Sequence, residues 1–280
     1  MAPYAIMGVV NVTPDSFSDG GRFADAAAAV AHAARLVEEG AQIVDVGGES
    51  TRPGADPVAV EAELERVLPV IAGAARLGAQ VSVDTMKLAV AEAAVEAGAS
   101  YVNDVTAFRH EPALAGLVAD RGLDCCLMHM LGEPRTMQAD PHYEDVVSEV
   151  KAFLEERLAA AVAAGVPEER VQLDPGIGFG KTVAHNLELL RRLEEIVAIG
   201  RPVVLGTSRK RFIGAITGRV AAADRVHGTV ATCVLGLERG ARVFRVHDVA
   251  AVADGLAVAA ATLLRVPAAT PPSPLNRASG

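Results

Sequence analysis

The stretch Gln42-Ile-Val-Asp-Val-Gly-Gly-Glu-Ser-Thr-Arg-Pro-Gly-Ala55 shows the unit from which this chain is built. Its apolar start, residues 42–46, suits a short strand that is buried on both faces. A glycine-rich polar loop follows, and residues 57–76 are strong helix formers with amphipathic spacing. The order of strand, polar loop and helix predicts a parallel βα unit whose loop carries functional side chains.

The same order recurs along the whole chain. The expected strands are 5–10, 42–46, 80–83, 101–105, 125–130, 171–173, 203–205 and 243–246. The expected helices are 26–39, 57–76, 88–97, 112–121, 143–164, 184–193, 222–239 and 250–264. This count predicts an α/β protein, a single (β/α)8 TIM barrel over residues 1–266, with residues 267–280 as a disordered tail. A doubly wound sheet would usually show a glycine fingerprint after the first strand, where this chain has Asn11-Val-Thr-Pro-Asp15.

Proline and glycine positions predict where the helices begin and end. Pro57 and Pro112 suit first helical turns, because the fixed φ of proline matches a helix and its missing N–H is not needed there. Five glycines follow expected helix ends, where a left-handed residue closes the helix. They are Gly40, Gly78, Gly98, Gly165 and Gly240.

Composition excludes several classes of protein. The 280 residues include 26 Lys and Arg against 35 Asp and Glu, a net charge of −9, and 51% are hydrophobic. This balance excludes a disordered chain and argues against nucleic-acid or anionic-membrane binding. No run approaches the roughly 18 apolar residues of a membrane span, and no basic signal-peptide region precedes the first apolar run. We therefore expect a cytoplasmic protein, whose cysteines, Cys125, Cys126 and Cys233, are reduced and buried.

Polar side chains stand at the end of every expected strand. Burying a polar side chain among Val, Ile and Leu costs folding free energy unless the group is hydrogen-bonded or serves a function. A barrel brings the carboxyl ends of all its strands to one rim. The set is Asn11, Asp45, Glu49, Asp84, Asn103, Asp104, His129, Asp174, Ser208, Lys210, Arg245 and His247. We expect a polar pocket, in which Asp45 and Glu49 have equally good structural explanations as loop hydrogen-bond partners. His129 is expected to be a packed histidine, and Asp104 to cap a neighbour because it points opposite to Asn103.

The chemistry of these residues constrains the ligand. Five cations suit phosphate groups: Arg52, Arg209, Lys210, Arg245 and His247. Three further side chains suit the edge of a planar heterocycle with several N–H groups: Asp84, Asn103 and Asp174. Asn11 and nearby acids suit Mg²⁺, which prefers oxygen ligands. The residues therefore predict a phosphorylated nitrogen heterocycle bound with magnesium.

The segment Gly176-Ile-Gly-Phe-Gly-Lys-Thr182 looks like a phosphate-binding loop without matching one. A Walker A loop requires glycine at position 175, where Pro175 stands, and a dinucleotide fingerprint requires glycine at Lys181. We expect the glycines to let the loop approach a flat ligand closely. A hydrolase is not indicated, since no G-x-S-x-G nucleophile turn is present.

Eight segments, in order, closely resemble the dihydropteroate synthase family, the pterin-binding enzymes of folate biosynthesis. They are Asn11-Val-Thr-Pro-Asp-Ser-Phe-Ser-Asp-Gly-Gly21, Asp45-Val-Gly-Gly-Glu-Ser-Thr-Arg-Pro-Gly-Ala55, Ser82-Val-Asp-Thr85, Asn103-Asp-Val105, Leu127-Met-His-Met130, Asp174-Pro-Gly-Ile-Gly-Phe-Gly-Lys181, Ser208-Arg-Lys210 and Arg245-Val-His-Asp248. The first two are long and specific, and the ordered set covers about residues 6–250. The resemblance implies a transferase that joins the methylene of 6-hydroxymethyl-7,8-dihydropterin diphosphate to the amine of 4-aminobenzoate, with diphosphate released.

The resemblance also implies roles for individual residues. The family's pterin-binding positions match Asp84, Asn103, Asp174 and Lys210. Its diphosphate-binding positions match Asn11, Thr51, Arg245 and His247, with the cofactor Mg²⁺ on Asn11. Its 4-aminobenzoate positions match Phe17, Ser18, Thr51, Arg52, Pro53, Phe179 and Ser208. Asp19, Lys210 and Asp84 are the expected catalytic residues, and Asp19 would stabilise the cationic methylene that departing diphosphate leaves.

Partners and alternatives follow from the same resemblance. It implies competition by sulfonamides at the 4-aminobenzoate site and a homodimer. A pterin-dependent methyltransferase stays open as an alternative, although it handles no diphosphate and has no need of the Arg245-Val-His247 segment. A non-catalytic pterin-binding paralogue is the other, and the presence of Asn11, Asp19 and Lys210 argues against it.

Overall fold

The computed structural model describes residues 3–13, 22–50, 55–133 and 135–263. Eight parallel strands form one sheet in the order β6-β5-β4-β3-β2-β1-β8-β7. The strands are β1 Ala5–Asn11, β2 Ile43–Gly47, β3 Gln80–Asp84, β4 Tyr101–Asp104, β5 Asp124–Met128, β6 Val171–Asp174, β7 Val204–Leu205 and β8 Val243–Val246. This order follows the chain around a barrel, as the sequence predicts.

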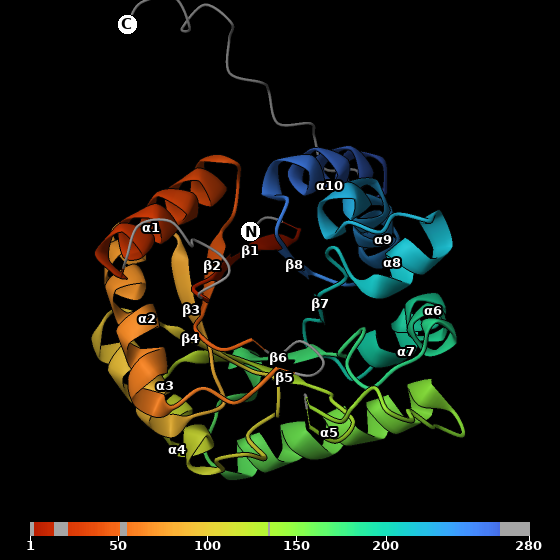
Figure 1. Cartoon of the computed structure of the whole chain (residues 1–280). Helices are drawn as coiled ribbons and strands as arrows, with labels where there is room; N and C mark the ends of the chain where they lie inside the picture. The colour runs from red at the N-terminus through yellow and green to blue at the C-terminus, as the bar shows by residue number, and fades with distance from the viewer. Residues whose placement is uncertain (1–2, 14–21, 51–54, 134, 264–280) are drawn as a thin grey trace, which may run out of the picture.

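The helices lie outside the strands and form a ring around them (Figure 1). They are α1 Arg22–Glu38, α2 Val60–Ala74, α3 Leu88–Glu96, α4 Ala113–Arg121, α5 Val146–Ala163, α6 Val183–Arg191, α7 Leu193–Val197, α8 Arg211–Thr217, α9 Val226–Glu238 and α10 Val249–Leu263, with short 3-10 turns at Glu168–Arg170 and Ala222–Arg225. None of the described helices has the length and apolarity that crossing a membrane requires.

The barrel closes between β6 and β7 through a narrow seam. An isolated parallel bridge pairs Leu173 with Val203, and the Leu173 amide donates to the Pro202 carbonyl at 3.0 Å. The next junction is also short, because β7 contains two residues, Val204 and Leu205. The expected single (β/α)8 barrel is thus confirmed, with one nearly closed junction.

Strand side chains alternate between two cores. The inner core contains six buried side chains from six strands: Met7, Ile43, Tyr101, Cys126, Val204 and Val243. The alternate residues pack outward against the helices, as Val44 and Val102 do. Because the side-chain period of a strand is two, the residue two positions after each inner residue also faces the barrel interior, one layer nearer the carboxyl end. This layer carries the polar residues of the site.

Several helix boundaries differ from the sequence prediction. Pro57 lies outside the first helical turn, because α2 begins at Val60, and Pro112 is the N-cap of α4. The five expected glycines all have positive φ, as predicted. The structure adds α8, which the sequence does not indicate because its seven residues, Arg211–Thr217, are too few for helical periodicity to emerge. The three cysteines are free and buried, and residues 267–280 lie outside the described residues.

Candidate active site

A cavity lies among the carboxyl ends of the strands, which we call the rim. Its lining residues are Asp84, Asn103, Val105, Met128, Asp174, Phe179, Gly206, Ser208, Lys210, Arg245 and His247. Eight of these are residues that the sequence singles out. The other three, Val105, Met128 and Gly206, carry no polar signal and are recognisable only from their places on or next to inward-facing strand positions.

Inward-facing strand positions explain why these residues meet. Asn103 lies two residues after the inner-core residue Tyr101, and Arg245 lies two residues after Val243. The register pairs Asp84 directly with Asn103 on the neighbouring strand. The barrel therefore places a polar layer above an apolar one, and the apolar layer excludes water from the base of the cavity.

Arg245 is the centre of the charge network in the cavity. Its Nε donates to Asp45 Oδ2 and its Nη2 to Asp84 Oδ2, both at 2.6 Å. Asp45 is fully buried and also accepts from Ser82 Oγ at 2.5 Å and from Asn103 Nδ2 at 3.2 Å. The expectation that Asp45 is a hydrogen-bond partner of loop backbone is wrong, because its carboxylate accepts from the side chains of Ser82, Asn103 and Arg245 and so positions two residues that line the cavity.

The environment changes the acidity of two cavity residues. Burial raises the pKa of the Asp84 carboxyl to about 7; Arg245 opposes this shift and the nearby carboxylate of Asp45 adds to it. Burial lowers the pKa of the Lys210 ammonium to about 8, and Asp174 opposes that shift. Both groups therefore change charge near neutral pH, which is typical of residues in functional sites.

Lys210 and Asp174 are held by the loop after β6. The Lys210 ammonium donates to the Ile177 carbonyl and lies 4.7 Å from the centroid of the Phe179 ring. Asp174 Oδ1 accepts from the Gly176 amide at 2.7 Å. The loop thus places the ring of Phe179 beside Lys210, which follows β7, in the cavity.

The glycines of this loop serve a purpose other than the expected one. Gly176, Gly178 and Gly180 all have positive φ. A Cβ at Gly176 would lie 1.8 Å from the carbonyl oxygen of His129, and one at Gly180 would lie 2.5 Å from Leu131 Cβ. The expectation that they admit a flat ligand is wrong for these two, because they admit the neighbouring loop of the chain itself.

His129 lies behind the loop, as a packed histidine. Its Nδ1 is 2.9 Å from Lys181 Nζ, which also donates to the Phe179 carbonyl at 3.0 Å. Burial lowers the pKa of His129 to about 2, with the neighbouring charge of Lys181 acting in the same direction. His129 is therefore neutral at physiological pH and serves as a support for the loop.

Ser208 and His247 contact each other across the cavity. Ser208 Oγ accepts from the His247 amide at 3.1 Å and lies 3.0 Å from His247 Nδ1. Arg209, which the sequence groups with the phosphate-binding cations, instead donates to both carboxylate oxygens of Asp248, at 2.9 and 2.5 Å. The expectation for Arg209 is therefore corrected, because its guanidinium extends to Asp248 and does not line the cavity.

Asp104 and Glu49 have structural contacts. Asp104 accepts from the amides of Thr106 and Phe108, both at 2.7 Å, and so caps the turn after β4 as predicted. Glu49 Oε2 accepts from Lys87 Nζ at 2.5 Å. Lys87, which the sequence gives no reason to single out, is 7% exposed and also donates at 2.5 Å to Glu63 Oε2 and to the Val58 carbonyl.

Some residues that the sequence places in the site are not among those that line the cavity. Asn11 ends β1 at the rim, half-buried and paired in register with Gly47. The remaining residues expected in the site lie outside the described residues: Phe17, Ser18, Asp19, Thr51, Arg52 and Pro53. Among the residues with described positions, no group of three or more His, Cys, Asp or Glu side chains is placed to hold a metal ion.

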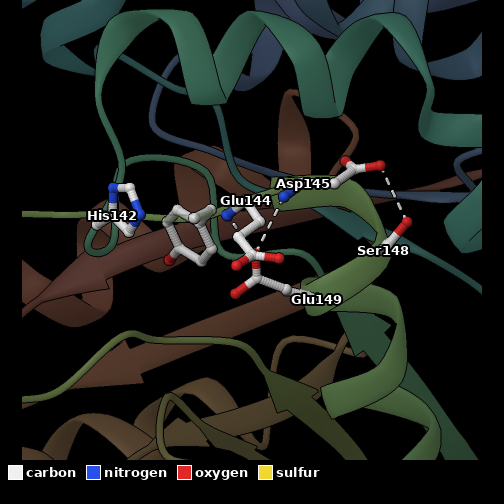
Figure 2. Close-up of a pocket in the computed structure, with 6 residues that line it drawn as sticks. His142, Glu144, Asp145, Ser148 and Glu149 are labelled. Atoms are coloured by element: carbon white, nitrogen blue, oxygen red, sulfur yellow. Dashed lines mark hydrogen bonds between the residues drawn. The ribbon is translucent and has the colours of Figure 1, made fainter.

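A second hollow lies at the start of α5 and has a different character. Its lining includes His142, Glu144, Asp145, Ser148 and Glu149 (Figure 2). Glu149 Oε1 accepts from the amides of Glu144 and Asp145 at 2.8 and 3.1 Å, and Asp145 Oδ1 accepts from Val147 at 3.0 Å. These carboxylates satisfy the amides at the start of their own helix, so the hollow has a structural explanation.

Comparisons with known proteins agree with this geometry. The profile of the family described as "pterin binding enzyme" matches residues 7–247. The dihydropteroate synthase of Neisseria meningitidis serogroup B is 49% identical over 258 residues, with 90% of each chain covered. The Xanthomonas albilineans dihydropteroate synthase solved with 4-aminobenzoic acid has a TM-score of 0.89 and 51% identity over 95% of each chain. The Yersinia pestis enzyme, solved in a sulfonamide drug complex, has a TM-score of 0.88 and 42% identity, and the match covers 93% of this chain and 94% of that one. This chain therefore belongs to the pterin-binding enzymes and, within them, to the dihydropteroate synthase family.

Proposed function

We propose that the rim cavity binds a dihydropterin diphosphate and that the chain joins its methylene carbon to the amine of 4-aminobenzoate. The observation that carries this proposal is the convergence of Asp84, Asn103, Asp174, Lys210 and Arg245 on one cavity at the barrel rim. Solved relatives with 4-aminobenzoic acid and with a sulfonamide support an aromatic amine as the second substrate and sulfonamides as competitors.

The pterin ring has matching partners in the cavity. Asp84, Asn103 and Asp174 offer carboxylate and carboxamide groups to the N–H and carbonyl groups on its edge. Lys210 and Phe179 lie together, with 4.7 Å between the ammonium and the ring centroid, so they offer a cationic and an aromatic face to the flat substrates. The apolar layer beneath, which includes Tyr101 and Cys126, keeps this contact dry.

The diphosphate is assigned to the carboxyl end of β8. Arg245 and His247 line it, and their positive or N–H groups suit phosphate oxygens. Ser208, which contacts His247, is assigned to the 4-aminobenzoate side. Thr51, Arg52 and Pro53 and the segment Phe17-Ser18-Asp19 are assigned to this aminobenzoate subsite, with Thr51 also on the diphosphate, through the family pattern alone.

Asn11 fits magnesium that arrives with the diphosphate. Mg²⁺ usually keeps several waters and takes one or two protein oxygens together with substrate phosphates, so one rim carboxamide is a sufficient protein contribution. Bound there, the ion would neutralise charge on the leaving diphosphate. Arg245 and His247 contribute to the same end from β8 and the loop after it, next to β1.

The chemistry follows as a substitution at carbon. The C–O bond to diphosphate breaks, a C–N bond to the arylamine forms, and the amine proton leaves to solvent. The arylamine is neutral at pH 7, so no strong general base is required. Asp19 stabilises the cationic methylene, and holding both substrates in one site raises the rate through proximity.

The assay that tests this proposal supplies the pterin diphosphate, 4-aminobenzoate and Mg²⁺ and measures dihydropteroate. We expect turnover with magnesium, loss of most turnover with a chelator, and competition by a sulfonamide against 4-aminobenzoate. Methyl transfer from a folate in place of dihydropteroate formation would indicate the methyltransferase alternative, and pterin binding without either reaction would indicate a non-catalytic paralogue.

We also propose a homodimer in the cytoplasm, as is usual for the family. Light scattering of the purified chain tests the assembly, with twice the 28.9 kDa chain mass as the expected result. A monomer at the concentrations of the activity assay would contradict it.

A further inference from the structure

We propose that Arg209 and Asp248 form a positioning pair that aligns the loop after β7 with the loop after β8, and so sets the diphosphate-binding geometry. This inference rests on the proposed function of the rim cavity. Both loops carry cavity residues next to the pair: Ser208 and Lys210 flank Arg209, and His247 precedes Asp248.

The backbone at Arg209 explains why its two neighbours share one cavity. Arg209 has a φ of 57°, in the left-handed region that a non-glycine residue rarely adopts. Ser208 and Lys210 both line the cavity, while the Arg209 side chain extends to Asp248. The left-handed turn thus places the side chains of Ser208 and Lys210 in the cavity and directs the side chain of the residue between them outward.

Four hydrogen bonds hold Arg209 in this conformation. Its amide donates to Thr229 Oγ1 at 3.0 Å, and its carbonyl accepts from Arg225 Nη1 at 2.8 Å. Its guanidinium donates from Nε and Nη2 to the two oxygens of Asp248. A non-glycine residue with positive φ is strained and persists only where its surroundings fix it, so these contacts maintain the turn.

The two loops are joined twice, inside the cavity and behind it. Inside, Ser208 Oγ contacts the amide and the imidazole of His247. Behind, the bidentate pair of Arg209 and Asp248 restricts both the distance and the rotation between the loops, which a single contact cannot do. The pair also neutralises a carboxylate next to His247, where an anionic diphosphate binds.

The exposure of the Arg209–Asp248 pair allows its role in positioning the loops to be distinguished from a contribution to folding stability. The side chains of Arg209 and Asp248 are 32% and 19% exposed, so solvent screens their attraction and the pair adds little to folding. The chain provides a control in Arg192, which donates to Glu195 and also forms a bidentate pair with Asp145 at 3.0 and 3.1 Å, with exposures of 31% and 42%. That pair connects the start of α5 to α6 and includes no residue of the rim cavity.

The test compares Arg209→Gln, Asp248→Asn, their double variant, Arg209→Lys and the control Arg192→Gln. For each protein we measure kcat/KM for the pterin diphosphate, the thermal midpoint, and the Kd of inorganic diphosphate with Mg²⁺ by calorimetry. We expect each single variant at the pair to lose about tenfold in kcat/KM and in diphosphate affinity, since misplacing a binding group by about 1 Å can cost up to about 100-fold. Arg209→Lys is expected to recover part of the loss, because it keeps the charge without the planar fork.

The pattern across variants decides the inference. The double variant should lose no more than the worse single variant, because either change breaks the same pair. Arg192→Gln should keep wild-type kcat/KM and diphosphate affinity while its midpoint shifts at least as much as that of Arg209→Gln, because it also loses the contact to Glu195. Wild-type kinetics in Arg209→Gln would overturn the inference that the pair positions the two loops. Losses that add up in the double variant would overturn it as well. An inactive wild-type enzyme would count against the proposed function instead. The diphosphate affinities of the variants would still test whether the pair positions the diphosphate site.

Discussion

The two ends of the barrel differ in the polar groups that their strands bury. At the amino-terminal end, Gln80 Nε2 donates to Asp124 at 2.7 Å and the Tyr101 hydroxyl donates to Gln172 at 2.9 Å. At the rim, Arg245 contacts two buried carboxylates at 2.6 Å. The first end pairs neutral side chains with each other or with a partly exposed carboxylate, Asp124, whereas the second concentrates buried charges around a cavity. The comparison teaches that a polar residue on a strand indicates function when it is charged, buried and next to a cavity.

The largest effect that this comparison predicts is that of replacing Arg245. Arg245→Met leaves Asp45 and Asp84 as buried carboxylates without their cation, so we expect a loss of about 3–5 kcal/mol in the free energy of unfolding together with loss of turnover. Urea denaturation measures the stability. Arg121→Met is the control, because Arg121 and its partner Glu96 are 51% and 66% exposed and should contribute almost nothing. Equal losses for the two variants would remove the distinction between the rim and an ordinary ion pair.

Lys210 tests whether the rim charges act on the substrate. Lys210→Ala should lower kcat by about 100- to 1,000-fold, the loss typical of removing one preorganised donor, while the circular dichroism spectrum stays unchanged. Lys151, a surface lysine on α5 whose side chain is 35% exposed, gives the matched control Lys151→Ala with wild-type turnover. Dihydropteroate formation at the wild-type rate by Lys210→Ala would contradict the assignment.

The pH dependence of the enzyme tests Asp84. Its pKa of about 7 means that the carboxyl is protonated below that value, and a protonated carboxyl is a poorer acceptor for pterin N–H groups. We therefore expect kcat/KM to fall by about tenfold per pH unit below pH 7. Asp84→Asn should be less active and should lack this limb of the profile, and a wild-type profile that is flat from pH 5 to 8 would contradict the prediction.

The contribution of Asp84 to folding stability should change with pH in the direction opposite to the change in kcat/KM. The folded pKa of Asp84, about 7, lies above the ordinary value of 3.8, so between these values the folded chain holds a proton that the unfolded chain has released. The contribution of Asp84 to the free energy of unfolding is therefore largest below about pH 4 and is lost as pH rises through 7. The difference in stability between wild type and Asp84→Asn, followed from pH 5 to 8, measures it.

The smallest effect is expected at the amino-terminal end. Tyr101→Phe removes one hydrogen bond to Gln172 without changing the ring packing, so we expect a loss of about 0.5–1.5 kcal/mol in the free energy of unfolding. Both KM values should stay at wild type. A change in KM would show that the inner core transmits strain to the rim.

The parts of the molecule that repeat were predictable from the sequence, and the parts that depend on one particular contact were not. Strand periodicity and the positions of polar residues such as Asn103 and Arg245 identify the barrel and most of the cavity. They do not identify Lys87, because only packing shows that three acceptors around it make burial of a lysine favourable. The direction of Arg209 depends on its left-handed φ, which residue type does not indicate.

The glycine loop shows the same limit. The sequence excludes the two phosphate-loop patterns around Gly176, because single residues decide those patterns. It predicts a close approach to a ligand there, whereas the neighbour is the carbonyl oxygen of His129. Which surface fills the space left by a missing Cβ is a tertiary property, and a sequence states only that the space exists.

The seam between β6 and β7 links ligand binding to the integrity of the barrel. Asp174 directly follows the bridging residue Leu173 on one side, and Gly206 and Ser208 follow β7 on the other, so the cavity spans the junction with the fewest strand contacts. A ligand that contacts both sides adds a noncovalent cross-link there and lowers the population of locally opened molecules. The amide of Leu173 should therefore exchange its hydrogen more slowly when a pterin is bound, and occupancy of the site becomes readable from a backbone position that lies in the barrel wall.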